Sequence, residues 1–191
     1  MATSANIIRA ESSAVNLTSD FFLKNFYRHN RNAIKVSTRS DYNSTELSYE
    51  DSRALKRAAA KLSSFDYTEE ENGDNIVSTI QAFAETYNNT LESSSSTDAE
   101  VYRQHKQLKA LTQKYADKLE DLGITVEKDG KLSVSENILK ASSFKEVREV
   151  FSDDSDYVKG LRKIAKRMHN TSYDEIYTMM TGCGGRLNIV L

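Results

Sequence analysis

The 191-residue sequence contains no proline, no tryptophan and a single cysteine, Cys183. Because proline breaks helices, its absence leaves nothing in the chain that forbids long uninterrupted helices. One cysteine excludes an internal disulfide and a zinc site built from several thiolates. No hydrophobic run is long enough for a transmembrane helix, and residues 1–15 lack the continuous apolar core of a secretory signal. We therefore expect a helical chain with neither membrane insertion nor a signal peptide.

Charge is nearly balanced, with 26 basic and 28 acidic residues and a formal net charge of −2. Acids and bases alternate along the chain, whereas a nucleic-acid-binding domain concentrates lysine and arginine on one face, so we expect no nucleic-acid partner. Hydrophobic residues make up 38% and the mean hydropathy is −0.61, which suits elongated helices that each bury one stripe. Ten tyrosines suit seams in which the ring is buried and the hydroxyl is wet.

Apolar residues recur with the period of an α-helix along most of the chain. Residues 48–65 begin with start signals at Ser48 and Asp51, and Leu55 and Leu62 fall on the stripe expected to be buried. Similar patterns predict further helices at residues 17–30, 74–91, 98–122, 142–151, 157–169 and 172–180.

Residues 74–93 and 97–122 are predicted to form an antiparallel helical hairpin. Residues 93–96 are all serine, which interrupts the helical pattern because serine competes for its own backbone groups, and Thr97 or Asp98 caps the second helix. The second helix repeats its apolar residues every seven positions, over about three repeats, which favours ordinary bundle packing over an extended coiled coil. The aromatic residues expected in the core or at seams are Phe83, Tyr87, Tyr102 and Tyr115.

The fold class is therefore expected to be mostly α: a helical bundle with a long antiparallel helical hairpin and a small two-stranded β-hairpin. The helical domain is expected over residues 47–181, after an N-terminal segment at 1–46 that holds one short amphipathic helix. Within that segment, residues 1–16 are expected to be poorly ordered and residues 31–43 to form a linker. Residues 182–191 form a Gly-rich C-terminal tail.

The period changes most abruptly at residues 122–141, LGITVEKDGKLSVSENILKA. A helix ends at the first glycine, two short alternating runs flank Asp129-Gly130, and a new helix begins after Ser135. Asp129-Gly130 suits the left-handed turn of a β-hairpin, and Ser135 suits the N-cap of the next helix. We therefore predict a two-stranded hairpin near residues 124–134.

The same stretch also fits a degenerate calcium-binding loop of the EF-hand type at residues 125–136. Such a loop places oxygen ligands at positions 1, 3, 5 and 12 and glycine at position 6. The corresponding ligands are Thr125, Glu127, Asp129 and Glu136. Threonine is a poor substitute for the aspartate usual at position 1. We therefore expect no metal and no cofactor, and keep a calcium-binding helical module as the alternative function.

No arrangement of residues predicts catalysis, and we expect the protein not to be an enzyme. His29, His105 and His169 lie far apart in sequence, in polar surroundings. Cys183 is flanked by glycines near Arg186, so it is either an exposed, activated thiol or an incidental cysteine in a flexible hinge, and the hinge is favoured. The basic residues of 159–167 are interpreted as a solvated face.

Five short motifs occur in an order that resembles a known family. They are LKRAAAKL at 55–62, FAETYN at 83–88, LGI at 122–124, DGKLS at 129–133 and VREVF at 147–151. Over about residues 50–170 this order resembles the C-terminal half of the bacterial flagellar filament-capping protein family, hook-associated protein 2. The resemblance implies a shortened relative whose helical domain packs against itself in a ring-like cap and guides flagellin assembly.

That resemblance implies a non-enzymatic structural or assembly protein that acts through protein–protein contacts, with no catalytic residues. The implied partners are the chain itself, as a homo-oligomer, or flagellin-like proteins. The resemblance also implies that the protein is exported with the flagellum without a cleaved signal. From the residues alone, we would expect a cytoplasmic protein.

Overall fold

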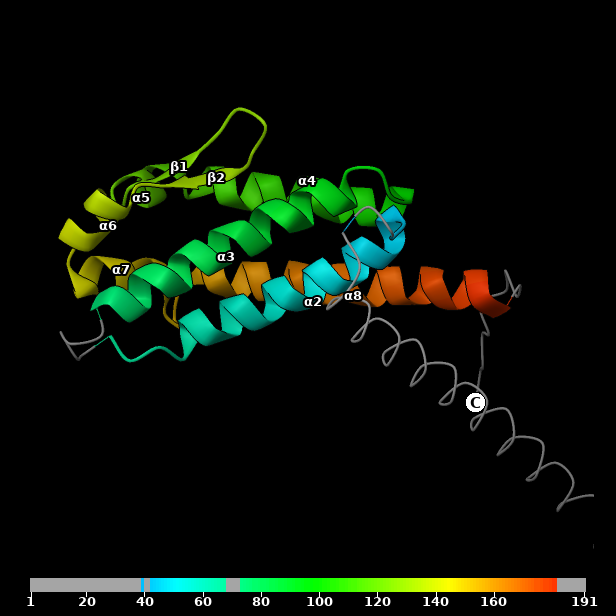
Figure 1. The fold of residues 1–191 in the computed structure, drawn as a ribbon, viewed down its shortest axis with the longest axis horizontal. Coiled ribbons are helices and arrows are strands. Elements are labelled where there is room, and N and C mark those ends of the chain that lie inside the picture. The colour runs from blue at the N-terminus through cyan, green and yellow to red at the C-terminus, as the bar shows by residue number, and fades with distance from the viewer. Residues whose placement is uncertain (1–38, 40–41, 68–72, 182–191) are drawn as a thin grey trace, which may run out of the picture. The chain divides into compact units, whose positions relative to one another are not determined.

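A computed structural model describes residue 39, residues 42–67 and residues 73–181 of the chain (Figure 1). Its helices are α2 (Ser44–Ser63), α3 (Gly73–Ser94), α4 (Ala99–Lys114), α5 (Ala116–Glu120), α6 (Glu136–Ala141), α7 (Phe144–Phe151) and α8 (Asp156–Thr181). Strands β1 (Ile124–Val126) and β2 (Leu132–Val134) form an antiparallel pair. The predicted mostly α class with a small β-hairpin is thus confirmed.

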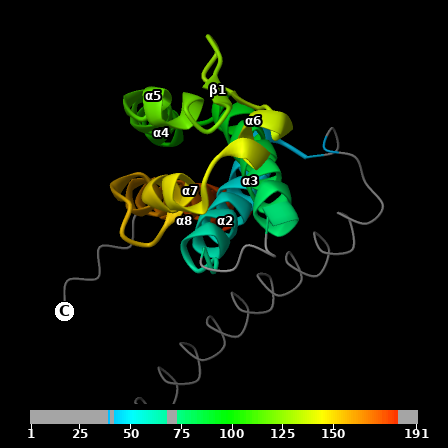
Figure 2. The ribbon, with the colours of Figure 1, turned by 90° about the vertical axis from the view of Figure 1, so that its left-hand side faces the viewer.

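Four long helices, α2, α3, α4 and α8, form the body of the described structure (Figure 1; Figure 2). α2 packs against both α3 and α8, and α4 packs mainly against α8. The Gln104 amide donates to the Thr171 hydroxyl (3.0 Å), and the hydroxyls of Thr112 and Tyr157 are 3.3 Å apart. Because the start of α4 meets the end of α8 and the reverse, these two helices run antiparallel.

The β-hairpin lies beside α3 and α4, which pack only sparsely against each other. Lys131 at its turn forms an ion pair with Glu92 of α3 (3.7 Å), whereas Gly130 lies against the side chain of Lys109 of α4. The predicted helical hairpin therefore exists, but the β-hairpin supplies part of the contact between its two helices.

The turn of the β-hairpin is built as the sequence predicted. The amide of Glu127 donates to the carbonyl of Lys131 (2.8 Å), and the amide of Gly130 donates to the carbonyl of Glu127 (2.8 Å). Gly130 has a φ of 91°, a left-handed conformation that glycine adopts without the steric cost of a Cβ atom. This three-residue connection, with glycine in its third position, matches the twist of the paired strands.

Aromatic rings fill the interior around the middle of α3, the junction of α4 and α5, the end of α7 and the start of α8. Phe151 packs against Phe83 (ring centroids 5.7 Å apart) and Tyr157 (6.2 Å), and Tyr157 packs against Tyr115 (5.1 Å). Phe83, Phe151 and Tyr157 are fully buried, as is Tyr87 on the next turn of α3. We call these five residues the aromatic end of the bundle.

Small polar side chains fill the interior at the opposite end, where α2 begins, α3 ends and α8 ends. The members are all buried, and they come from all four long helices: Thr45, Ser48, Thr90, Ser94, Gln104 and Ser172. We call this set the polar end. It was not predicted, because each residue taken alone fits a solvated helix surface.

The first corrections concern where helices start. α2 begins at Ser44, four residues before the predicted start, because Asn43 and Glu46 form a reciprocal capping box. Ser48 was therefore wrong as a cap; it is buried inside the bundle. Ser135 does precede α6, but its side chain makes no capping hydrogen bond.

A second correction concerns the predicted helix at 98–122, which the structure divides. α4 ends at Lys114, the amide of Tyr115 turns back to the carbonyl of Thr112 (3.0 Å), and the short α5 follows. The break lets the Tyr115 ring pack on Tyr157. Asp98 caps α4 through the amide of Glu100 (3.1 Å), which confirms the predicted start.

The third correction joins two predicted helices, 157–169 and 172–180, into the single helix α8. Side chains such as those of Thr171 and Ser172, at the predicted gap, can compete for backbone hydrogen bonds. In the folded chain their hydroxyls bond Gln104 and Ser48 instead. The predicted helix at 17–30, nearly all of the 31–43 linker and the 182–191 tail lie outside the described residues.

Candidate functional site

The predicted calcium loop is folded as a ladder. Thr125 pairs with Ser133 across the two strands, and the Asp129 carboxylate accepts from the amide of Lys131 (2.9 Å). A calcium loop must instead curl its oxygens around one centre. Within residues 42–67 and 73–181, no group of three or more histidine, cysteine or acidic residues is placed to hold a metal.

The fourth predicted ligand, Glu136, is engaged elsewhere. Its carboxylate forms an ion pair with Lys140 one turn along α6 (2.8 Å) and accepts from the Gln81 amide of α3 (3.4 Å). The hydrogen bond and charge of Lys140, followed by the hydrogen bond of Gln81, hold the pKa of this carboxyl below its ordinary value. Glu136 therefore fastens α6 rather than closing a loop over the turn.

Asn88 of α3 holds the hairpin in place. Its side-chain amide donates to the carbonyl of Leu132 (2.9 Å), and its side-chain carbonyl accepts from the amide of the same residue (2.7 Å). Asn88 thus satisfies the outer edge of β2 as a neighbouring strand would. The sequence contained this residue within the motif FAETYN, but nothing in the local pattern assigned it a partner 44 residues away.

The other motif residues also meet one another. Phe83 of FAETYN packs on Phe151 of VREVF, and Asn88 of the former bonds Leu132 of DGKLS. Gly123 of LGI has a φ of 75°, and its carbonyl accepts from the amide of Ser135 (2.8 Å). The motifs therefore mark where residues 122–135, which we call the connector, and α7 pack against α3, which is a structural role.

Hydrogen bonds between helices order the polar end. The Ser172 hydroxyl of α8 donates to the Ser48 hydroxyl of α2 (3.1 Å), and the Thr90 hydroxyl of α3 lies 3.2 Å from the carbonyl oxygen of Asp51. Buried hydroxyls need such partners because an unpaired polar group in the interior is costly. These bonds fix how far each helix is shifted along its neighbours.

His169 lies beside this end, in the seam between α2 and α8. Its ring stacks on the Tyr49 ring (centroids 4.4 Å apart), and its Nδ1 lies 3.2 Å from the backbone carbonyl of Tyr49, so Nδ1 carries the hydrogen. Burial, and then the charges of Lys56, Arg53 and Arg57, lower the pKa of His169 to about 4. The ring is therefore neutral at pH 7 and acts as a packed hydrogen-bond donor.

His105 and Ser94 are the closest approach to a nucleophile and base. Their Nδ1 and Oγ atoms are 3.0 Å apart, but the Ser94 hydroxyl donates to the carbonyl of Thr90 (2.5 Å). Burial and the charge of Lys109 lower the pKa of His105. Ser94 is 0% exposed, so no substrate reaches its oxygen. The pair ties α3 to α4.

Glu175 is the most unusual acid of the polar end. Burial, and then the negative charge of Asp98, raise its pKa to about 7, while a hydrogen bond with Thr45 acts in the opposite direction. Glu100, in the first turn of α4, adds further repulsion. The last two turns of α8 thus carry a carboxyl that is partly protonated near neutral pH.

Four large apolar side chains are exposed on the elements at the same end. Met179 is 59% exposed, Met180 50% and Tyr177 37%, and all three lie on the last turns of α8, which extend past the start of α2 (Figure 1). Tyr102, expected in the core or a seam, is 40% exposed on the first turns of α4. We call these four residues the apolar tip.

The surface depression found at the opposite end is shallow and charged. It measures about 360 Å³ and lies between α7 and the start of α8. Its lining residues are Lys145, Arg148, Glu149, Ser152, Asp154 and Ser155. Cys183 and His29 lie outside the described residues.

Comparison of the chain with protein-family models, curated proteins and solved structures finds no match. The resemblance to flagellar capping proteins therefore remains a prediction from the sequence. None of the described helices has an apolar stretch of the length needed to pass through a bilayer.

Proposed function

We propose that this chain is a non-enzymatic structural or assembly protein that works through protein–protein contacts on its helix faces. The proposal keeps the role implied by the resemblance to the helical domain of flagellar capping proteins. The proposal is supported by the contacts of the polar side chains inside the bundle. The buried hydroxyls and both described histidines form hydrogen bonds with the backbone or with one another, and these bonds join helices.

The apolar tip is the observation that carries the proposal. Large apolar side chains that stay exposed together are typical of contact sites, whereas scattered ones are ordinary. Four of the five large hydrophobic residues exposed in the described structure lie in the apolar tip; Ile138 is the fifth. Methionine and tyrosine adapt well to a partner surface, because one is flexible and the other has both apolar and polar atoms.

Two measurements test the proposal. Light scattering across a dilution series measures self-association, and calorimetric titration with purified flagellin measures binding to the partner that the resemblance implies. The variant Met179→Ser with Met180→Ser should lose binding to flagellin, because it removes the most exposed apolar surface. Ile138→Ser, which removes a residue that is 51% exposed on α6, serves as the matched control and should bind as the wild type does. A wild-type chain that stays monomeric at high concentration and binds no flagellin contradicts the proposal.

A further inference from the structure

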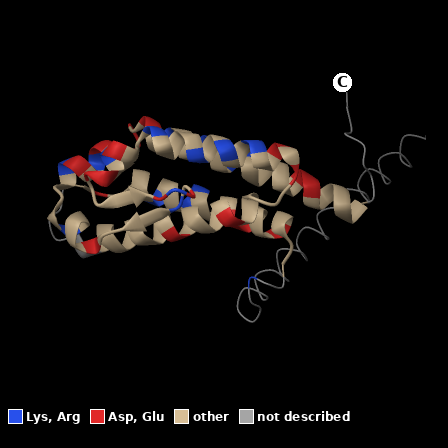
Figure 3. Cartoon of the chain, turned by 90° about the horizontal axis from the view of Figure 1, so that it is seen from above, with Lys and Arg blue, Asp and Glu red and all other residues tan. Residues whose placement is uncertain are grey.

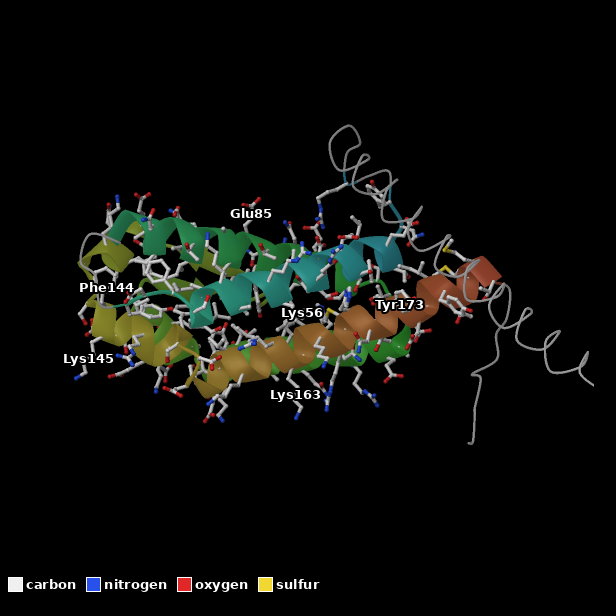
Figure 4. The ribbon with its side chains drawn as sticks, turned by 90° about the horizontal axis from the view of Figure 1, so that it is seen from below. Lys56, Glu85, Phe144, Lys145, Lys163 and Tyr173 are labelled. Carbon is white, nitrogen blue, oxygen red and sulfur yellow. The ribbon has the colours of Figure 1, made fainter. Side chains whose placement is uncertain are left out.

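Four cations lie on two helices, α2 and α8, that pack side by side. Lys56 and Arg57 belong to α2, and Lys163 and Lys166 belong to the neighbouring α8. Lys56 lies in the seam between the two helices and Lys163 points outward from α8 (Figure 4). Lys56 and Arg57 are near enough to α8 for their charges to lower the pKa of His169. We call these four residues the basic face.

Other charged residues of α2, α8 and the segment before α8 lie at the borders of the basic face, and they pair with one another rather than with its four cations. At one end Arg53 forms an ion pair with Glu50 (3.7 Å), and at the other Arg162 forms one with Asp153 (2.7 Å). Lys159 donates to the carbonyl of Asp154 (2.9 Å). Glu50 and Asp153 are thus already paired with cations outside the face.

The four cations themselves make no ion pair or side-chain hydrogen bond within the described part of the chain. Other cations in this structure do have such partners, as Arg103 has in Glu100 (2.9 Å) and Lys140 in Glu136 (2.8 Å). Like charges held side by side repel one another and attract anions from solution. The sequence prediction that bases and acids are interleaved is therefore correct along the chain but not across this surface.

Negative charge is concentrated elsewhere on the same chain. α3 contains no lysine or arginine, and Figure 3 shows where the acidic and basic residues of the chain lie. Glu85 points outward from the side of the bundle opposite to Lys163 (Figure 4). The strongest concentration is the connection between α2 and α3, residues 66–74, with the sequence DYTEEENGD. It has five acidic residues and no basic one.

We propose that the basic face binds the acidic connection, residues 66–74, of a second copy of this chain. This inference rests on the proposed function, since it names one partner and one surface for the protein–protein contacts. Glu69, Glu70 and Glu71 set three negative charges against the four positive ones, which gives the charge complementarity that the proposal needs. Each copy offers one basic face and one acidic connection, so the contact is heterologous and can continue from copy to copy into a ring or a chain.

The contact should be weak and sensitive to salt. Exposed ion pairs each contribute little, and added salt screens them over the distances that separate the charges. We expect self-association of the wild type to weaken roughly tenfold or more between 0.05 M and 0.3 M salt, because several such pairs are lost together. This measurement needs no variant, so it tests the inference even if a substituted chain fails to fold.

Charge reversal tests which surfaces meet. The face variant carries Arg57→Glu, Lys163→Glu and Lys166→Glu, all at exposed positions; the connection variant carries Glu69→Lys, Glu70→Lys and Glu71→Lys. Each should be monomeric alone by sedimentation velocity, because its own face and connection then share one sign. An equimolar mixture should associate again, because each variant supplies the charge that the other has lost.

The control carries Lys118→Glu, Lys128→Glu and Lys145→Glu, three exposed lysines outside the basic face. It makes the same change in net charge as the face variant and should associate as the wild type does. Circular dichroism checks that all variants keep their helices.

The outcomes separate this inference from the proposed function. If the face variant still self-associates as the wild type does, the contact lies on another surface. This result overturns the inference but leaves the proposed function standing. If the two variants are monomeric alone and remain monomeric when mixed, the inference is also overturned. That result is expected if the basic face binds the acidic connection of its own chain or a different polyanion. A wild type that never self-associates but binds flagellin overturns only the inference; failure of both overturns the proposed function as well.

Discussion

At the aromatic end of the bundle, Phe83, Phe151 and Tyr157 are packed ring against ring, whereas at the polar end Ser48, Ser172 and Gln104 are joined by hydrogen bonds. Burial of large rings gains free energy in proportion to area and depends little on orientation. Buried hydrogen bonds add little net stability, yet a missing partner is costly. The aromatic end therefore supplies stability, and the polar end specifies how the helices are aligned.

The two ends also differ in what surrounds them. Beside the aromatic end, Asn88 of α3 holds the connector through Leu132, and Phe83 of α3 contacts Phe151 of α7. The polar end carries the apolar tip on its outside. A hydrogen-bonded interior beneath an exposed apolar surface suits a contact site, because directional bonds hold the presenting helix in one position.

The largest expected effect comes from truncating the aromatic end. Phe151→Ala removes a fully buried ring between Phe83 and Tyr157 and should lower the free energy of unfolding by about 3–5 kcal/mol. Urea denaturation followed by circular dichroism measures it. Phe144→Ala, at the half-buried first position of the same helix, is the control and should cost clearly less. Equal losses for both would show that the ring cluster is not the main source of stability.

Release of the connector should have a smaller effect. Asn88→Ala leaves the amide and carbonyl of Leu132 without their partner and should cost about 1–3 kcal/mol. Hydrogen exchange of the Leu132 amide should accelerate along with this loss. Asn89→Ala on the next residue of α3 leaves both bonds intact and should be nearly neutral. Unchanged exchange in the Asn88 variant would contradict the assigned role.

Removing both hydroxyls of the Ser48–Ser172 pair should cost less than the sum of removing each one alone. Ser172→Ala leaves the buried Ser48 hydroxyl unpaired and should cost about 1–2 kcal/mol, and Ser48→Ala should cost a similar amount. The double variant removes both polar groups and should be closer to the wild type than the sum of the single losses. Strictly additive losses in this double-mutant cycle would show that the two hydroxyls do not stabilise each other.

The smallest expected effect is a pH dependence in which two groups of the polar end oppose each other. The pKa of His169 falls from 6.5 to about 4 in the folded chain, so the unfolded state binds more protons between these values and stability rises with pH. The pKa of Glu175 rises from 4.5 to about 7, so the folded state binds more protons and stability falls as pH rises through this range. The lowered pKa of His105 acts in the same direction as that of His169.

Urea midpoints at pH 4.5, 5.5 and 6.5 separate the two contributions. Relative to the wild type, Glu175→Gln should make stability rise more steeply with pH, and His169→Gln should make it rise less steeply. Comparing each variant with the wild type at the same pH cancels the titration of the other groups. Parallel profiles for all three chains would contradict the assignment.

Several elements were predictable because their cause is local. The stripe of Leu55 and Leu62 predicted a helix, Asp98 predicted the start of α4, and Gly130 predicted the hairpin turn. In each case the signal lies within a few residues of the structure it produces. The start of α2 was missed although its signal was equally local, since Asn43 and Glu46 form the capping box.

The rest was not predictable because its cause lies far along the chain. Ser48 looked like a helix cap until Ser172, 124 residues later, was placed against it. The same contact explains why α8 continues through residues that favour a break. Tyr115 interrupts a helical pattern because Tyr157 gives its ring a place to pack. The candidate contact surfaces share this property, since the basic face needs α2 and α8 side by side.

The sequence by itself determined the class of this protein, its helices in outline and the hairpin with its left-handed glycine, because hydrophobic period and backbone sterics act over one or two turns. Only the tertiary structure decided which polar residues are buried and which cations share a surface. Both depend on which helices become neighbours, and in this chain those neighbours are set by packing between residues tens of positions apart.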